Sequence, residues 1–288
     1  MTEEQCRDTT GTLYVVATPI GNLEDITYRA VRILNQVDLV AAEDTRHSRK
    51  LFAHFGIHKP LVSYHDHNEQ QRQEELLLRL QAGENIALIS DAGTPCIADP
   101  GYRLIASCHA AGITVVPIPG PSAIITALSA AGVSTERFAF EGYLPQRTKA
   151  RGDLLRQLNG EQRTLVFYEA PHRLAATLAD LVEIMGAERP LVVARELTKL
   201  YEEFFRGTAA EALTRFTQEP ARGELVLMIP PSSQGPQMNV RDALRKLLNE
   251  SDLSRREAVK LIAKEYGLSG SDVYRESLSL AKEEDNYK

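Results

Sequence analysis

Short apolar runs alternate with helical patterns along most of this chain of 288 residues. The runs are rich in Val, Ile and Leu, and stretches with apolar residues at helical spacing lie between them. Continuous apolar runs are typical of strands buried on both faces, and parallel neighbours need a crossover connection that is usually a helix. The alternation therefore predicts an α/β protein with a mainly parallel, helix-covered sheet. We expect strands at 12–21, 37–43, 85–90 and 113–122, and helices at 25–36, 69–83, 102–112 and 122–132.

The alternation begins again after residue 152, which predicts a second α/β lobe. Its expected strands are 163–171, 190–198 and 223–231, and its expected helices are 172–186 and 207–216. A linker follows at Pro230–Gln237, and then three short helices that predict a small bundle at 239–251, 254–267 and 269–280. Ser254 and Ser271 are the expected N-caps there, and Gly267 the expected helix stop. The predicted domains are therefore 12–124, 125–232 and 239–284.

The charge balance limits the partners that the whole surface can attract. Lys and Arg number 33 against 39 Asp and Glu, for a net charge of −6. This balance argues against a protein that coats nucleic acid nonspecifically, but it allows an enzyme that meets structured RNA through a local basic patch. Arg46–Lys50 and Gln146–Arg156 are two candidate patches, although runs of charge are usually solvated faces and the sequence favours that interpretation of both.

The cysteines and the N-terminus indicate a compartment. Cys6, Cys96 and Cys108 have no metal-binding or disulfide-framework spacing, which favours a reducing cytoplasm. The polar, acidic N-terminus is not typical of a signal peptide, and we expect no membrane anchor. His65 and His67 are close in sequence, but no third ligand is obvious, so no metal is expected.

Three turns rich in Pro and Gly follow three strands of the first lobe, in the stretches ATPIGNLEDIT, SDAGTPCIADPG and PIPGPSA. In open α/β sheets, ligands bind outside the carboxyl ends of the strands where the strand order switches. Glycine allows the backbone to approach a ligand, and proline stiffens the loop. Since neither a phosphate-binding loop nor a nucleophile elbow is present, the turns predict a pocket for a nucleoside-like ligand rather than for a nucleoside triphosphate.

The same stretches, with FEGYLP, resemble the tetrapyrrole methylases, a family of S-adenosylmethionine-dependent transferases. AAEDTRHSRKL, YEAPHRL and RELTKLYEE are more narrowly similar to members that methylate small-subunit (16S) ribosomal RNA at the 2′-hydroxyl of a cytidine. The resemblance implies the class III methyltransferase fold, with two α/β lobes and S-adenosylmethionine in the cleft between them, and a homodimer. The implied partner is ribosomal RNA, within the assembled small subunit because of the acidic net charge.

The resemblance also implies which residues contact the methyl donor. These positions are Pro19, Gly21, Asn22, Asp91, Ala92, Gly93, Thr94, Pro95, Ile97, Pro119, Gly120, Ser122, Ala123, Leu144, Ala170, Ala194, Glu196 and Leu197. In relatives acting on porphyrin-like rings, the first turn reads Gly-x-Gly-Pro-Gly, and only Gly21 of that pattern is kept here. A tetrapyrrole substrate is therefore disfavoured.

Methyl transfer to a ribose hydroxyl needs a proton acceptor, and the ribosomal-type motifs supply three acids. Glu43, Asp44 and Glu169 are the candidate bases, and Arg46, Arg195 and Lys199 are candidates for holding phosphates or lowering the hydroxyl pKa. Glu43 and Asp44 can instead cap a helix. Glu169 can instead pair with Arg173, four residues later, and Glu196 can pair with Arg195.

Other interpretations remain open at this stage. The C-terminal helices can dock on RNA or the ribosome, or can support a dimer or another domain. His65, His67 and His172 can contact RNA, although His172 also fits the start of a helix. The rival functions are methylation of a small tetrapyrrole and a non-catalytic ribosome assembly factor with a retained donor pocket.

Overall fold

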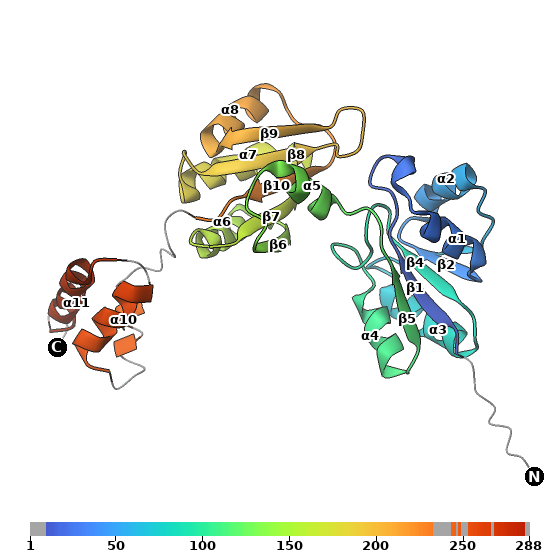
Figure 1. The fold of residues 1–288 in the computed structure, drawn as a ribbon, viewed down its shortest axis with the longest axis horizontal. Coiled ribbons are helices and arrows are strands. Elements are labelled where there is room, and N and C mark those ends of the chain that lie inside the picture. The colour runs from blue at the N-terminus through green and yellow to red at the C-terminus, as the bar shows by residue number, and fades with distance from the viewer. Residues whose placement is uncertain (1–9, 233–242, 246, 249–252, 266–267, 286–288) are drawn as a thin grey trace, which may run out of the picture. The chain divides into compact units, whose positions relative to one another are not determined.

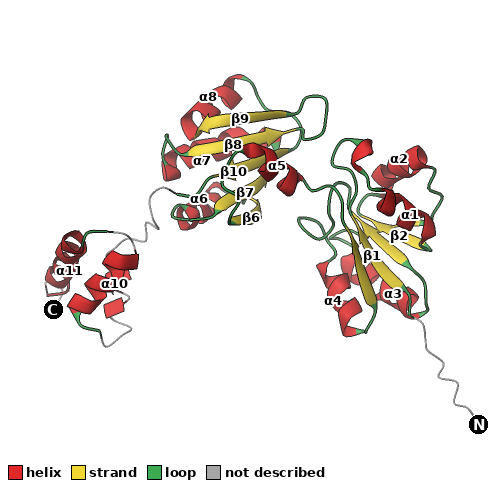
Figure 2. Ribbon diagram, in the orientation of Figure 1, coloured by secondary structure: helices red, strands yellow, loops and turns green. Residues whose placement is uncertain are grey.

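The computed structural model describes residues 10–232, 243–245, 247–248, 253–265 and 268–285 (Figure 1). The chain forms two compact units. The first is Met1–Ala130 with Ala194–Glu203, and the second is Ala131–Val193 with Phe204–Lys288. Two five-stranded sheets, drawn in yellow in Figure 2, form the centres of the fold.

The first sheet has the order β3-β2-β4-β1-β5, and the four neighbouring pairs are parallel. Its strands are β1 (Thr12–Val16), β2 (Leu39–Ala42), β3 (Leu61–Ser63), β4 (Ile86–Ile89) and β5 (Thr114–Ile118). The crossovers hold η1 (Leu23–Asp25), α1 (Tyr28–Gln36), α2 (Thr45–Phe55), α3 (Glu69–Gln81) and α4 (Tyr102–Ala110), and α5 (Ala123–Ala131) follows β5. The predicted parallel, helix-covered sheet is confirmed.

Helices cover both faces of this sheet because alternate strand residues point to opposite sides. In β2, Val40 and Ala42 belong to the apolar cluster that includes α1 and α2. Leu39 and Ala41 belong to the cluster that includes α3 and α4. Burial on both faces explains why the strands read as continuous apolar runs.

The second sheet mixes parallel and antiparallel strands in the order β6-β7-β10-β8-β9. Its strands are β6 (Phe138–Tyr143), β7 (Thr164–Glu169), β8 (Pro190–Arg195), β9 (Glu203–Thr208) and β10 (Leu225–Ile229). β6 is parallel to β7, whereas β10 is antiparallel to β7. The helices α6 (Thr148–Leu158), α7 (Pro171–Met185) and α8 (Ala209–Gln218) pack in one apolar cluster with this sheet. The expected second α/β lobe is present.

The C-terminal region is helical, as expected, in α10 (Arg255–Glu265) and α11 (Gly270–Asp285). A separate small apolar cluster, including Ala258, Ile262 and Val273, joins these helices. Ser254 caps α10, because its hydroxyl accepts the Glu257 N–H at 3.4 Å and its own N–H donates to the Glu257 carboxylate.

The predicted cap at Ser271 is wrong. Ser269 caps α11 by accepting the Asp272 N–H at 3.2 Å, and Ser271 lies in the first turn of that helix. Gly267, Cys6 and residues 233–237 of the expected linker lie outside the described residues, as does most of the helix expected at 239–251. In the part of the chain that the structure describes, no helix is long and apolar enough to cross a membrane.

Candidate active site at the carboxyl edge of the first sheet

The strand order of the first sheet creates a switch point between β1 and β4. These two strands are neighbours, but the chain leaves β1 toward β2 on one side and leaves β4 toward β5 on the other. The connections therefore pass over opposite faces of the sheet and separate at the carboxyl ends of the two strands. This is the edge where the sequence predicts a ligand pocket.

Hydrogen bonds join the three predicted turns at that edge. Thr18, after β1, and Gly93, after β4, exchange two backbone hydrogen bonds of 2.9 and 3.0 Å. The Thr18 hydroxyl donates to the Ser90 carbonyl at 3.1 Å. Thr94 then donates its hydroxyl to the Pro121 carbonyl, in the turn after β5, at 3.2 Å. The prediction that the three turns converge is confirmed.

Two glycines allow this close approach. Gly93 has a φ of +80°, and a Cβ added there would lie 3.2 Å from Cγ2 of Ile20. A Cβ added at Gly120 would lie 3.0 Å from the Cβ of Ala17. Any side chain would press the turns apart, so the backbone itself lines this part of the edge.

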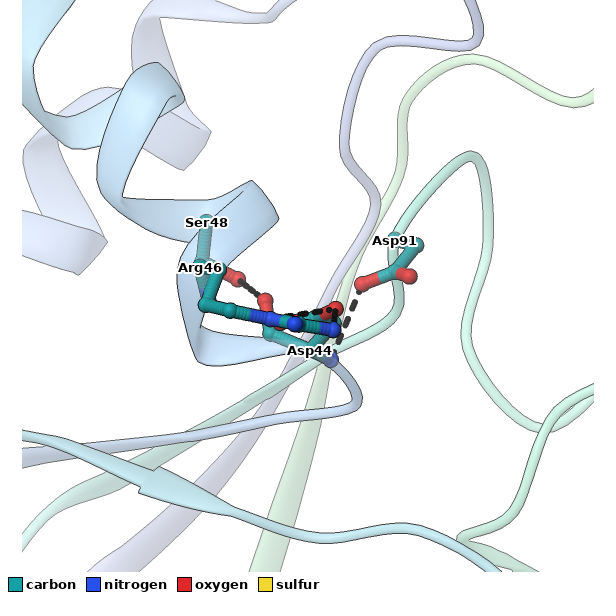
Figure 3. Close-up of polar contacts among 4 residues, drawn as sticks. All are labelled: Asp44, Arg46, Ser48 and Asp91. Atoms are coloured by element: carbon teal, nitrogen blue, oxygen red, sulfur yellow. Dashed lines mark hydrogen bonds and ion pairs between the residues drawn. The ribbon is translucent and has the colours of Figure 1, made fainter.

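Glu43, Asp44 and Asp91 are held together by reciprocal bonds between the ends of β2 and β4. The Asp44 N–H donates to Oδ1 of Asp91 at 3.0 Å, and the Asp91 N–H donates to Oε2 of Glu43 at 3.2 Å. Figure 3 shows Asp44 between Asp91 and the first turn of α2, which carries Arg46 and Ser48. The strand order makes these contacts possible, because β2 and β4 are neighbours.

The two adjacent acids after β2 differ in electrostatics. Burial raises the pKa of the half-buried Glu43 carboxyl, and the nearby Asp99, Asp91 and Asp66 raise it further, although its bond from the Asp91 N–H opposes this. Hydrogen bonds from Arg46 instead hold the pKa of Asp44 well below its ordinary range. Asp44 also caps α2 and pairs with the Arg46 guanidinium at 2.7 Å. The capping alternative therefore describes Asp44 but not Glu43.

Asp99 is a further acidic residue near Glu43 and Asp91 that was not predicted from the sequence. Burial raises the pKa of its carboxyl, and Asp91 and Asp66 add to the rise. The acids in SDAGTPCIADPG and HDHNE were the signal available in the sequence, but only the strand order brings Asp66, Asp91 and Asp99 near one another.

Among the described residues, no His, Cys, Asp or Glu group is arranged to hold a metal ion.

The segment Ala194–Glu203 supplies further contacts within the first unit. The Asn22 N–H donates to the Thr198 hydroxyl at 3.2 Å, and a Cβ at Gly21 would lie 2.5 Å from Cγ of Lys199. Glu196 and Thr198 both have positive φ, at 48° and 64°. Non-glycine residues in this conformation often mark sites where strain serves a function.

Arg195 and Glu196 each have an ion-pair partner other than the neighbour considered from the sequence. Arg195 pairs with Glu203 at 2.6 Å, and Lys199 pairs with Glu196 at 2.9 Å. Thr198 is a further contact residue that was not predicted, and only its place between predicted residues could have indicated it.

Glu169 lies in the second unit, at the end of β7, with a buried carboxylate. It accepts hydrogen bonds from the Thr177 hydroxyl at 2.6 Å and from the Ala170 N–H at 2.8 Å, and it lies 3.3 Å from Arg173. These contacts agree with the alternative in which Glu169 pairs with Arg173 and stabilises the fold. Arg173 also donates to the carbonyl of the buried Leu144. The roles of Glu169, Leu144 and Ala170 at a site stay predictions.

The remaining predicted positions lie on the three turns, at the start of α5 or in the segment Ala194–Glu203. Pro19 and Pro95 are buried, Ala92 and Pro119 are exposed, and Ile97 is 50% exposed. The other members, in or beside α5 and β8, are Ser122, Ala123, Ala194 and Leu197. His65 and His67 stack edge to face at 5.9 Å, and His172 is exposed in the first turn of α7.

Comparison with known proteins identifies a family and several relatives. The model of the tetrapyrrole (corrin/porphyrin) methylases matches residues 12–213. A protein from Synechocystis sp. named ribosomal RNA small subunit methyltransferase I is 51% identical over 275 residues, covering 94% of this chain and 98% of its own. A protein of the same name from Pasteurella multocida is 48% identical over 273 residues, covering 93% and 97%.

Solved structures show the same fold at low sequence identity. Uroporphyrin-III-C-methyltransferase from Thermus thermophilus has a TM-score of 0.56 at 21% identity, covering 76% of this chain and 94% of its own. Diphthine synthase has a TM-score of 0.61 at 13% identity, covering 76% and 90%. At these identities the likeness concerns the fold alone.

Proposed function

The chain belongs to the tetrapyrrole (corrin/porphyrin) methylase family, and we propose that it transfers a methyl group from S-adenosylmethionine to small-subunit ribosomal RNA, at the 2′-hydroxyl of a cytidine. The observation that carries the proposal is the pair of relatives named ribosomal RNA small subunit methyltransferase I. Each shares about half of its residues with this chain over nearly the full length of both proteins.

The turns after β1, β4 and β5 fit the donor chemically. Gly93 and Gly120 let the three turns approach one another closely, and the bonds between Thr18 and Gly93 hold the turns after β1 and β4 in place. Asp91 adds a carboxylate suited to ribose hydroxyls or to an ammonium group. When bound, S-adenosylmethionine supplies an activated methyl group with a good leaving group. The eighteen donor contacts expected from the resemblance are retained as part of this proposal.

In this proposal the protein contributes position and a proton acceptor. Rigid turns hold the acceptor hydroxyl at about 3 Å from the reacting carbon, which is catalysis by proximity. Glu43 is the preferred base, because its raised pKa brings it closer to the working pH, whereas Asp44 is engaged by Arg46. Arg46, Arg195 and Lys199 keep their proposed role beside the phosphates.

The assembly and cellular setting belong to the same proposal. In this proposal the substrate is ribosomal RNA within the assembled small subunit, and the protein acts as a homodimer in the cytoplasm. The proposed domains are 12–124, 125–232 and 239–284. The acidic net charge supports a preassembled surface over loose RNA.

Labelled S-adenosylmethionine tests the proposal directly. The protein is incubated with free small-subunit RNA, with small subunits from cells lacking the enzyme, or with a porphyrin precursor. We expect label in the RNA of the subunits and one linkage that resists alkali, because 2′-O-methylation blocks the attacking hydroxyl. Label only in the porphyrin would show a tetrapyrrole methylase instead. Binding of subunits without transfer under any condition would show an assembly factor.

A further inference from the structure

The helices α1 and α2 carry an unbalanced positive charge in an acidic protein. α1 contains Arg29 and Arg32, and α2 contains Arg46, Arg49 and Lys50, and neither helix contains Asp or Glu. Both helices pack in one cluster on the same face of the first sheet (Figure 1). On the opposite face, α3 and α4 together carry three acidic and three basic residues. The excess charge therefore belongs to one face of the first unit.

The helical spacing places these residues on exposed stripes. Arg29 and Arg32 are three residues apart on α1, and Arg49 and Lys50 follow Arg46 at spacings of three and four on α2. The basic side chains are exposed, while Ile33 and Leu51 of the same helices are buried. Each helix therefore turns its apolar side to the sheet and its basic side to solvent.

Helix stability does not explain the stripes. Like charges at these spacings weaken a helix, and cations near its first turn oppose the helix dipole. The charge of Arg46 is offset by its ion pair with Asp44. Among the described residues, Arg29, Arg49 and Lys50 have no ion pair, and Arg32 donates a hydrogen bond only to the neutral Gln36 side chain. Four positive charges therefore remain for an outside partner.

The stripes begin beside the candidate active site. A helix that follows a parallel strand runs back along it, so the first turns of α1 and α2 lie at the carboxyl edge of the sheet. Asp44 joins the start of α2 to Asp91 at that edge. Tyr28, the first residue of α1, is 98% exposed there. An exposed aromatic ring beside cations suits an unpaired base next to its phosphates.

We infer that Arg29, Arg32, Arg49 and Lys50 form a docking surface for the phosphate backbone of the RNA substrate, with Tyr28 stacking on a base near the modified nucleotide. The inference rests on the proposed function and names the surface through which that RNA is held. We call this surface the α1–α2 basic face. It binds phosphates and positions the substrate without taking part in methyl transfer.

Neutralising variants test the α1–α2 basic face. The full-length variants R29Q/R32Q and R49Q/K50Q are compared with R72Q/R79Q, which removes the same charge from α3. Filter binding of small subunits is measured between 50 and 250 mM salt, and methyl transfer is measured in parallel.

Each double test variant lowers the slope of log Kd against log salt by about 1.5, and the quadruple variant R29Q/R32Q/R49Q/K50Q lowers it by about 3. The quadruple variant raises KM for the subunit about tenfold, with kcat within twofold of wild type. The control R72Q/R79Q changes neither the salt slope nor KM. Y28A weakens binding by about tenfold.

Several results would overturn the inference. Unchanged slope and KM in the quadruple variant would remove the RNA contact. A change in sedimentation that accounts for the whole loss would make the face an interface between copies of the chain. Wild-type protein that binds subunits with the expected slope but transfers no methyl group would overturn the proposed function and leave the docking surface standing. Wild-type protein that binds no subunits would overturn both.

Discussion

Two strands of this protein, β2 in the first unit and β7 in the second, lead into an acidic residue just before a helix, and the two acids have opposite surroundings. Glu43 after β2 is half-buried among other carboxylates, and among the described residues it accepts one hydrogen bond, from the Asp91 N–H at 3.2 Å. Glu169 at the end of β7 is buried and held by a hydroxyl, a backbone N–H and a guanidinium. The same local sequence pattern therefore gives one carboxylate with a raised pKa and one that is fully engaged in structure.

The sheet architecture explains this difference. In the parallel sheet, the loops after neighbouring strands gather at one edge, so acids from different strands meet there and repel one another. In the mixed sheet, β10 runs against β7, and the end of β7 is occupied by the first turns of α7. The carboxylate with the raised pKa therefore lies at the end of β2, and the carboxylate held by several partners lies at the end of β7.

The largest expected effect is that of Glu43→Gln. If Glu43 is the base, kcat falls by about 10² to 10⁴ while the melting temperature changes little. Asp44→Ala is the neighbouring control, and it removes the cap of α2 with a cost of about 1 kcal/mol. Single-turnover methylation of small subunits, combined with thermal unfolding, distinguishes the two variants. Full activity of Glu43→Gln would remove Glu43 from the proposed mechanism.

Glu169→Gln should act on stability instead. It disturbs a buried network and costs about 1–3 kcal/mol, which corresponds to a fall in melting temperature of about 2–4 °C per kcal/mol. Thr177→Val, which removes a hydroxyl bonded to the same carboxylate, should lower stability in the same direction. Activity per folded molecule should stay near wild type. A drop in kcat without a loss of stability would make Glu169 a catalytic residue after all.

Gly93→Ala should weaken donor binding by about tenfold, because a left-handed alanine costs about 1–2 kcal/mol and its Cβ would press on Ile20. Gly56→Ala is a matched control. Gly56 also has positive φ, at +63°, but a Cβ there would meet nothing within 4 Å. The control should lose about 1 kcal/mol of stability and keep its affinity, as measured by titration calorimetry with S-adenosylmethionine. Equal affinities for both variants would contradict a donor site at this turn.

The smallest effect is a shift in the pH profile. A base acts when deprotonated, so kcat should fall on acidification with a midpoint above the ordinary Glu value of 4.5. If Asp44 were the base, the midpoint would lie below the ordinary carboxyl range. The raised pKa also means that the contribution of Glu43 to stability is greatest below 4.5 and declines as the pH rises through its folded-state value. Rate measurements across the acidic and neutral range separate the two acids.

The buried strands of the fold were predictable from the sequence, and the strands at the sheet edges were mostly not. The continuous apolar runs located β1, β2, β4, β7, β8 and β10, and also β5 at the edge of the first sheet. The edge strands β3, β6 and β9 were not predicted, because they are less buried and their apolar pattern is interrupted. The helices α2 and α6 were not predicted either, because their basic residues obscured the helical spacing.

The site was predictable to the level of turns but not of contacts. Proline and glycine in three turns indicated where backbone would approach a ligand, and the bonds of Thr18 and Thr94 confirm their meeting. The exchange of bonds between Asp44, Asp91 and Glu43 could not be predicted, because it requires that β2 and β4 be neighbours although α2, β3 and α3 separate them in sequence.

The discontinuous first unit limits how this protein can be cut into parts. A fragment that stops at residue 130 would lack Ala194–Glu203, although Thr198 of that stretch bonds to the backbone of Asn22. Such a truncation would leave the turn after β1 without one of its partners. Splitting the protein into working halves would therefore require a graft, or a short synthetic peptide added in trans, to restore that stretch to the fragment.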